Sequence, residues 1–331
     1  MSASALTGQL PRVALAFLPT PVHALPRLEN VLGDSPRLLI KRDDQTGLAT
    51  GGNKTRKLEF LVGDALAQGA DTLITPGGPQ SNHCRQTAAA AARYGLRCVL
   101  VLSGPPQPPA AFTGNLLLNA LLGAEIRWTE GRPREEVMAE VAREVTRAGG
   151  KPYVIPTGGS VPVGAAGYVA AVEELAEQLR TQGEQVDRIV VVAGSGGTHA
   201  GVLVGVKALG LGAQMIGMNN FAVPDIAGTV LQLARESSAL LGLNLAITPD
   251  DLIFYDACGT HPYGVITDAE REGIRLLART EGILLDPVYT GRAFAHLIGL
   301  IRMGAFAPEE TILFWHTGGF PGLLARAEDM V

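Results

Sequence analysis

Cysteine is scarce in this sequence, with three residues in 331, and aromatic side chains make up only 5% of it. The three cysteines, Cys84, Cys98 and Cys258, lie far apart and form no Cys-x-x-Cys pair. An odd, scattered set argues against a disulfide framework and against a structural zinc site. We therefore expect reduced thiols, no metal site and a cytoplasmic location.

Long basic or apolar runs are also missing. The net charge is −5 and no basic stripe is present, so no nucleic-acid partner is expected. The N-terminal residues show no basic segment ahead of an apolar one, so no secretory signal is expected. The uncharged stretch Ile189–Val206 contains five glycines. This composition predicts a strand, a loop and a helix rather than a membrane span.

What the sequence does contain is a regular alternation of short apolar runs with longer helical patterns. The predicted strands are mostly continuous in apolar residues, as in strands buried on both faces. They lie at 37–42, 71–75, 97–102, 125–129, 188–193, 214–219 and 311–315. Helices are predicted at 54–68, 81–94, 134–148, 164–182, 224–241, 267–281 and 291–303. The alternation predicts an α/β fold with two open, mostly parallel twisted sheets and helices on both faces.

The segment Gly194–Thr198 follows a predicted strand and holds three glycines where a helix begins. Free backbone N–H groups and the helix dipole would favour an anion such as phosphate at this point. A tight corner without a ligand is the alternative, but the serine and threonine among the glycines exceed what a corner needs. The dinucleotide pattern G-x-G-x-x-G fails, because His199 takes the place of the third glycine and no acid follows the next strand.

Lys54 directly follows a Gly-Gly-Asn triplet at the start of a predicted helix. The segment Gly47–Thr55 nearly matches the P-loop pattern, but Asn53 is inserted before the lysine, and one extra residue turns a helical position by about 100°. The partial positive charge of a helix N-terminus disfavours protonation of Lys54, and a neutral amine is what Schiff-base formation requires. A solvated lysine beside Arg56 and Lys57 is the alternative that the local sequence allows.

Six motifs, in order along essentially the whole chain, resemble the D-cysteine desulfhydrase and 1-aminocyclopropane-1-carboxylate (ACC) deaminase family. They are KRDDQTGLATGGNKTRKLEFL at 41–61, GGPQSNHCRQTAA at 77–89, GSGGTHAG at 194–201, PYGV at 262–265, GILLDPVYTGRA at 282–293 and HTGG at 316–319. The resemblance implies fold type II of the pyridoxal phosphate (PLP) enzymes, with the cofactor in a cleft between two α/β domains. We place the large PLP-binding domain at 1–50 and 164–331 and the small one at 51–163. A homodimer is also implied.

The same resemblance implies roles for individual residues around the cofactor. Lys54 would carry PLP covalently and move the proton at the substrate Cα. The cofactor phosphate would lie in the loop of Gly194, Ser195, Gly196, Gly197 and Thr198. Asn82 would approach the 3′-oxygen of PLP, and Ser81, Asn82 and His83 would receive the substrate carboxylate.

Four further residues complete the implied site. Tyr263 and Tyr289 would face a small amino-acid substrate and, with Lys54 and Ser81, form the catalytic set. Thr290 and Thr317 would lie near the pyridine nitrogen. Core tyrosines with satisfied hydroxyls, and a plain N-cap role for Ser81, are the simpler alternatives.

Thr290 decides between the reactions of this family. ACC deaminases resemble the chain at Asp-Pro-Val-Tyr but carry Glu at the position of Thr290. A carboxylate there would keep the ring nitrogen protonated, whereas a neutral threonine cannot, so the electron sink is weaker. We therefore predict a carbon–sulfur lyase that converts D-cysteine to pyruvate, ammonia and hydrogen sulfide by β-elimination. The alternatives are an L-cysteate sulfo-lyase, an ACC deaminase, a PLP-binding protein without catalysis and a nucleotide-binding module.

Overall fold

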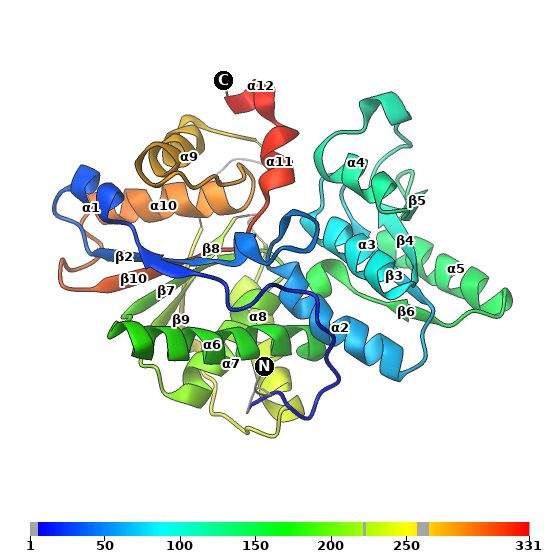
Figure 1. Cartoon of the computed structure of the whole chain (residues 1–331), viewed down its shortest axis with the longest axis horizontal. Coiled ribbons are helices and arrows are strands. Elements are labelled where there is room, and N and C mark those ends of the chain that lie inside the picture. The colour runs from blue at the N-terminus through cyan, green and yellow to red at the C-terminus, as the bar shows by residue number, and fades with distance from the viewer. Residues whose placement is uncertain (1–5, 221–222, 257–264, 331) are drawn as a thin grey trace.

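The computed structural model describes residues 6–220, 223–256 and 265–330. Two open sheets lie side by side, one of six strands in the order β1-β2-β10-β7-β8-β9 and one of four in the order β5-β4-β3-β6 (Figure 1). The strands are β1 Val22–Ala24, β2 Arg37–Arg42, β3 Thr72–Gly77, β4 Arg97–Leu102, β5 Glu125–Trp128, β6 Pro152–Val154, β7 Arg188–Ala193, β8 Gln214–Asn219, β9 Leu252–Tyr255 and β10 Thr311–His316.

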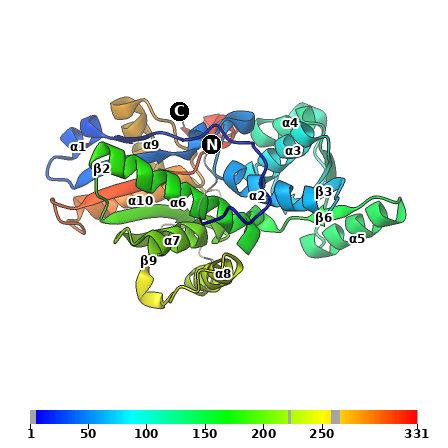
Figure 2. The same ribbon diagram turned by 60° about the horizontal axis from the view of Figure 1, so that its bottom comes forward.

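The six-stranded sheet is parallel except for β1, which pairs antiparallel with β2. Its four central strands are buried on both faces, so neighbouring residues of β7 enter different cores, Val191 on one side and Val190 on the other. Figure 2 shows one face covered by α6, α7 and α8, and α1, α9 and α10 cover the other. Their bounds are α1 Pro26–Leu32, α6 Pro162–Gln182, α7 Gly197–Leu209, α8 Ile226–Leu240, α9 Asp268–Glu281 and α10 Thr290–Arg302.

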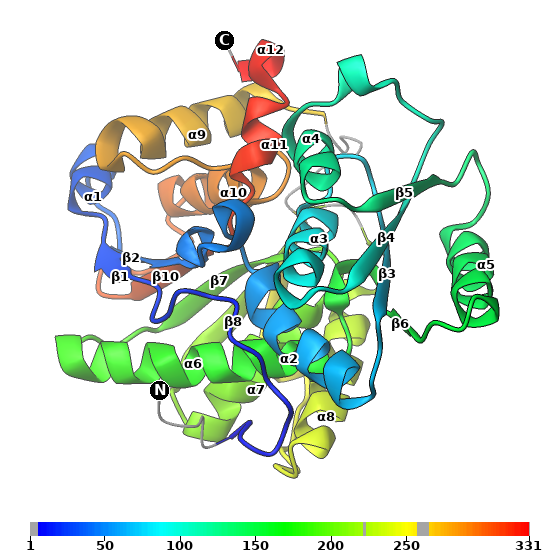
Figure 3. The ribbon, with the colours of Figure 1, turned by 45° about the vertical axis from the view of Figure 1, so that its right-hand side comes forward.

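The four-stranded sheet is parallel throughout. Helices α2, α3 and α4 pack on one face and α5 packs on the other, as Figure 3 shows. Their bounds are α2 Lys54–Ala67, α3 Asn82–Tyr94, α4 Gly114–Leu121 and α5 Arg134–Arg147, and two short helices, α11 Phe320–Leu324 and α12 Ala327–Met330, follow β10.

Local signals account for the ends of several helices. Ser81 caps α3, where its hydroxyl accepts the backbone N–H of Cys84 at 3.2 Å. Thr267 and Glu270 form a capping box at the start of α9, which pairs two backbone N–H groups that a helix start leaves without partners. These caps mark the residues at which α3 and α9 begin.

The predicted α/β architecture with helices on both faces of mostly parallel sheets is confirmed. Each predicted strand and helix is present with its ends within two residues of the prediction. The prediction missed β1, β6 and β9, because three or four residues are too few to show a repeating pattern. It also missed the short helices α1, α4, α11 and α12. The division into domains at 1–50, 51–163 and 164–331 stays a prediction.

Helix α2 is held against the large sheet by a close backbone approach. A Cβ atom at Gly167 of α6 would lie 2.3 Å from the carbonyl oxygen of Arg56, one turn into α2. Real Cβ atoms do not come that close to a backbone oxygen, so only glycine lets the two helices meet here. The contact therefore sets the distance between the first turn of α2 and α6.

A buried network of charges reinforces this joint. Asp43 accepts hydrogen bonds from Arg56 at 2.8 and 2.9 Å, from Tyr168 at 2.7 Å and from the indole of Trp315 at 2.9 Å. Arg56 also donates to Glu174 of α6. Burial alone would raise the pKa of Asp43, but the Arg56 guanidinium outweighs it and holds the pKa at about 2. Both charges are therefore retained inside the protein.

Candidate active site

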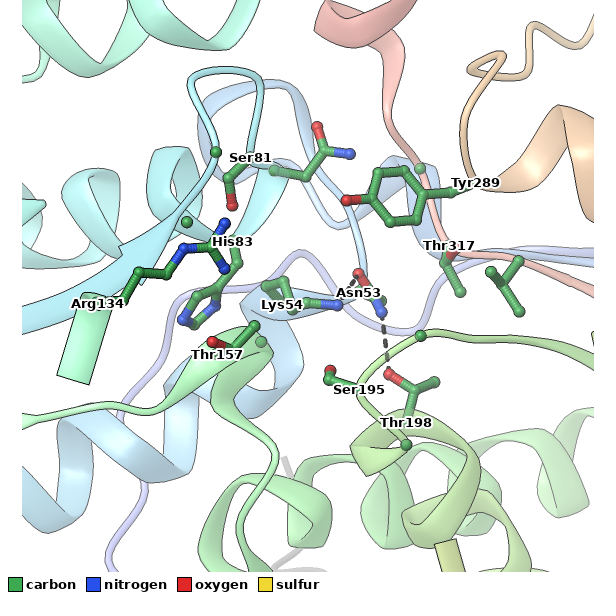
Figure 4. A pocket seen from close by; sticks show the side chains of 18 residues that line it. Asn53, Lys54, Ser81, His83, Arg134, Thr157, Ser195, Thr198, Tyr289 and Thr317 are labelled. Atoms are coloured by element: carbon green, nitrogen blue, oxygen red, sulfur yellow. Dashed lines mark hydrogen bonds between the residues drawn. The ribbon is translucent and has the colours of Figure 1, made fainter. Parts of the chain in front are cut away.

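A cavity of about 490 Å³ opens between the two sheets, at the carboxyl ends of their strands. This is where ligands bind in open parallel α/β sheets, and the volume suits a cofactor with a small substrate. Figure 4 shows the side chains that converge on it from both sheets. It is lined by Asn53, Lys54, Gly77, Gly78, Ser81, Asn82, His83, Arg134, Thr157, Gly158, Val192, Gly194, Ser195, Gly196, Thr198, Tyr289, Thr317 and Gly318.

Lys54 is the first residue of α2 and extends into the middle of the cavity (Figure 4). Its Nζ donates to Asn53 Oδ1 at 3.2 Å, and the amide of Asn53 donates to the Thr198 hydroxyl at 2.9 Å. Burial lowers the pKa of Lys54 to about 8. A far larger share of this amine than of an ordinary lysine is therefore neutral near physiological pH, as a nucleophilic lysine requires.

The glycine loop leads from β7 into α7 and forms the floor of the cavity. The N-cap residue of α7 is Gly196, which has no side chain to accept hydrogen bonds from the N–H groups of the first turn. The hydroxyl of Ser160 lies 2.8 Å from that of Ser195 and accepts the N–H of Gly197 at 3.2 Å. Backbone donors at a helix start form an anion site of the kind that the sequence predicted.

Lys57 lies beside this loop, and the sequence reasoning treated it only as a neighbour of Lys54. It is 1% exposed, and its Nζ donates to the carbonyl of Gly158 at 3.1 Å and to Ser160 Oγ at 3.3 Å. A Cβ atom at Gly197 would lie 2.6 Å from the same Nζ. Within the described residues Lys57 has no carboxylate partner. Its spacing of three residues from Lys54 was the available signal, since it places both on one helix face.

Burial lowers the pKa of Lys57 well below its usual value, and the nearby charge of Lys54 lowers it further. An unpaired buried ammonium is costly, and a bound anion would offset that cost. The start of α7 and the buried cation therefore fit a phosphate group together.

The start of α3 forms the opposite wall, with Ser81, Asn82 and His83 all lining the cavity. His83 is 5% exposed, and its Nδ1 has no partner among the described residues. Burial lowers the pKa of His83 well below 6.5, and the charges of Lys54 and Lys57 act in the same direction. The ring is therefore neutral, and its Nδ1 is available to a ligand.

Of the remaining predicted site residues, some line the cavity and others do not. Tyr289 and Thr317 line the cavity, and the tyrosine ring points into it (Figure 4). Thr290 and Gly197 lie outside the lining, and the Thr290 hydroxyl donates to Asp286 Oδ1 at 2.9 Å. Tyr263 lies outside the described residues. Contacts of these residues with a cofactor stay predictions.

Residues 13–318 match the family described as pyridoxal-phosphate dependent enzymes. The chain belongs to this family. PLP is thus its cofactor, and the structural features of the cavity fit that cofactor. Lys54 offers an amine of lowered pKa, and Lys57 and the start of α7 offer the donors that its phosphate needs.

Relatives within the family match almost the whole chain. It is 41% identical over 333 residues to a 1-aminocyclopropane-1-carboxylate deaminase of Burkholderia vietnamiensis, with 97% of each chain covered. It is 42% identical over 330 residues to one of Burkholderia cenocepacia, with 96% of each covered. The solved structure of an ACC deaminase homologue superimposes with a TM-score of 0.88 at 40% identity, covering 100% of this chain and 99% of that one.

A more distant structure supports the fold alone. A threonine deaminase of Solanum lycopersicum has a TM-score of 0.64 at 16% identity, covering 96% of this chain and 82% of that one. The predicted fold type II is confirmed by these structures, and the predicted cofactor is confirmed by the family match.

The prediction of a D-cysteine desulfhydrase is wrong, and the carbon–sulfur lyase assignment is withdrawn with it. The relatives that match this PLP-dependent enzyme over its full length carry the name of ACC deaminase instead. The prediction placed Thr290 near the ring nitrogen and argued from its lack of a carboxylate. In the structure the Thr290 hydroxyl is buried and donates to Asp286 Oδ1, and the identity of this one residue does not decide between the two leaving groups.

Neither a metal site nor a membrane span is present among the described residues. No group of three or more His, Cys, Asp or Glu side chains there is placed to hold a metal ion. None of the helices in the same part of the chain combines the length and apolar character needed to cross a membrane.

Proposed function

We propose that this PLP-dependent enzyme is a lyase that opens the ring of 1-aminocyclopropane-1-carboxylate and releases 2-oxobutyrate and ammonia. The observation that carries the proposal is the match, at 40–42% identity over 96–100% of the chain, to relatives and a structure named for ACC deaminase. The cavity supports it, because its volume of about 490 Å³ leaves room for a small substrate beside the cofactor.

ACC carries no hydrogen on its α-carbon, so the reaction cannot begin with removal of an α-proton. A base must act on a ring carbon, and a proton must later be returned to one. PLP supplies an electron sink for the charge that develops on the amino-acid carbon skeleton. The chain itself must therefore supply groups that move protons in the middle of the cavity.

Lys54 and Tyr289 are the groups proposed for this proton movement. Lys54 Nζ has a pKa of about 8, near the value at which an amine can both accept and return a proton at neutral pH. The Tyr289 ring enters the cavity from the side opposite to Lys54 (Figure 4). Tyr263 is proposed to join them on the basis of the family resemblance.

The start of α3 is proposed to hold the substrate carboxylate. Backbone N–H groups and the dipole of a helix start attract an anion, and Ser81, Asn82 and His83 line the cavity at that point. Asn82 is also proposed to approach the cofactor oxygen, and Thr290 and Thr317 to lie on the side of its ring nitrogen. The loop Gly194–Thr198 and Lys57 are proposed to hold the phosphate.

The test is direct. Purified protein loaded with PLP should release 2-oxobutyrate and ammonia in equal amounts from ACC, and Lys54→Ala should abolish both. Arg180→Ala, a change on an exposed surface of α6, serves as the control. Release of pyruvate and sulfide from D-cysteine with no 2-oxobutyrate from ACC would overturn the proposal.

Two proposals on organisation rest on the family resemblance. The chain is proposed to form a homodimer and to act in the cytoplasm. Light scattering of the purified protein should give twice the mass of the 34.6 kDa chain. A monomer mass over a range of concentrations would contradict the first of them.

A further inference from the structure

Arg134 is the only arginine among the described residues that line the cavity, and no sequence motif pointed to it. It is the first residue of α5, so it reaches the cavity from the four-stranded sheet. In Figure 4 its guanidinium points to the part of the cavity that Ser81 and His83 line, and Tyr289 lies on the opposite side.

A second observation places Arg134 near the start of α3. Burial raises the pKa of the Cys84 thiol to about 11, and the charge of Arg134 acts against that rise. Cys84 lies in the first turn of α3 and donates its backbone N–H to Ser81. The guanidinium is therefore within electrostatic range of the helix start that faces the cavity.

Arg134 has an anchor but no counter-charge. Its Nε donates to the hydroxyl of Ser103 at 2.5 Å, and within the described residues no carboxylate forms an ion pair with it. Nearby Arg132, by contrast, pairs with both Glu136 and Glu140. Since a guanidinium has five N–H donors, the anchored side chain still offers its two terminal nitrogens to the cavity.

The position of Arg134 in its helix is electrostatically unfavourable. The N-terminus of a helix carries partial positive charge, which favours acids such as the Glu135 and Glu136 that follow. A cation in the first position conflicts with this local rule, and such conflicts concentrate at functional sites. An anion bound beside Arg134 would remove the conflict.

We infer that Arg134 binds the carboxylate of the amino-acid substrate, together with the start of α3. This inference rests on the proposed function, in which the substrate is a small amino acid. A guanidinium can bind both oxygens of a carboxylate, which orients it as well as attracting it. Because Tyr289 lies across the cavity, a substrate held by Arg134 and Ser81 would present its ring carbons to the tyrosine.

The test uses PLP-loaded protein and compares ACC with cyclopropylamine, which is ACC without its carboxylate. Binding of each is followed by the absorbance of the bound cofactor. Arg134→Met should raise the Kd for ACC about tenfold or more, in line with the loss of a hydrogen bond between charged groups. The Kd for cyclopropylamine should stay unchanged. Arg134→Lys should recover part of the loss, because an ammonium keeps the charge without the paired geometry.

Two further variants sharpen the result. Ser103→Ala keeps the charge and removes the anchor, so it should weaken ACC binding less than Arg134→Met does. Arg132→Met removes a nearby arginine that does not line the cavity and should leave both ligands unaffected.

Equal weakening of ACC and cyclopropylamine by Arg134→Met would overturn the inference, because it would reveal a merely structural role. Weakening confined to ligands with a second acidic group, such as aspartate, would overturn it too. If wild-type protein shows the Arg134-dependent preference for ACC but releases no 2-oxobutyrate, the proposed function fails and the inference stands.

Discussion

The Nε2 atom of His83 lies 2.8 Å from the hydroxyl of Thr75, and this contact fixes the tautomer of the imidazole. The single proton of the Thr75 hydroxyl is donated to the carbonyl of Ile155, also at 2.8 Å. The hydroxyl can therefore only accept from the ring, so Nε2 carries the hydrogen and Nδ1 has a free lone pair. Nδ1 is the atom that has no partner among the described residues, so the cavity wall offers a hydrogen-bond acceptor.

Replacing Thr75 with valine should therefore destabilise the protein. The change leaves the Nε2–H of His83 without an acceptor in a buried site, which costs about 1–3 kcal/mol. Urea unfolding of the cofactor-free protein measures this cost. The matched control is Thr146→Val, because the Thr146 hydroxyl bonds a carbonyl on an exposed helix surface. Equal effects of the two substitutions would show that His83 does not depend on Thr75.

Lys57→Met should weaken binding of the cofactor phosphate. Loss of a charge-assisted hydrogen bond predicts a rise in the Kd for PLP of about 10- to 100-fold. Pyridoxal, which lacks the phosphate, should bind the variant and the wild type alike. Both constants come from titrating cofactor-free protein by absorbance. Lys207→Met, which removes a partly exposed lysine paired with Asp251 far from the cavity lining, is the control. A parallel loss of pyridoxal binding would refute a phosphate-specific role.

Lys54→Met should stabilise the cofactor-free protein at pH 7. Burial lowers the pKa of Lys54 from 10.5 to about 8, so its charged form is disfavoured in the folded state. Between these values the unfolded chain binds more protons, so stability rises with pH. The penalty is complete below about pH 8 and vanishes above about pH 10.5, and a shift of this size corresponds to about 3 kcal/mol.

Thermal unfolding at pH 7 and at pH 10.5 tests this sign. The gain from Lys54→Met should be present at the lower pH and absent at the higher one. Lys151→Met, at an exposed lysine, should change neither value. A gain that persists at the higher pH would show that packing, rather than charge, is responsible.

Asp43→Asn should cost about 3–5 kcal/mol at pH 7, because it leaves the buried Arg56 charge without its main partner. The pKa of Asp43 is held at about 2, below the usual 3.8 of an aspartate, so its contribution is full above about pH 4. It is lost as the pH falls toward 2, and the gap between variant and wild type should narrow there. Chemical denaturation across this range measures it. Glu177→Gln, in an exposed pair with Arg180, should cost less than about 1 kcal/mol.

The parts of the site that sequence reasoning anticipated are those in which one short segment carries the chemistry. Lys54 follows a distinctive triplet, and the loop before α7 combines three glycines with a helix start. Ser81 has the local signature of an N-cap, and the structure shows that cap. The strands were equally readable, because continuous apolar runs report burial on both faces.

The parts that it missed depend on contacts between distant segments. Lys57 resembles a surface lysine until α7 and the turn at Thr157–Gly159 close over it. Arg134 follows an unremarkable loop, and only the packing of α5 brings it to α3. Thr290 led to a wrong prediction of the reaction, because the sequence alone does not show that its hydroxyl donates to Asp286.

The contact between Gly167 and the Arg56 carbonyl has a mechanical consequence for catalysis. Because backbone touches backbone there, an added methyl group could not be absorbed by the rotation of a side chain. It would push the whole first turn of α2 outward and carry the amine of Lys54 with it. A displacement of one ångström at a reacting nitrogen can slow a reaction about a hundredfold. The absence of a side chain at Gly167 of α6 thus determines how far the amine of Lys54, on α2, extends into the cavity.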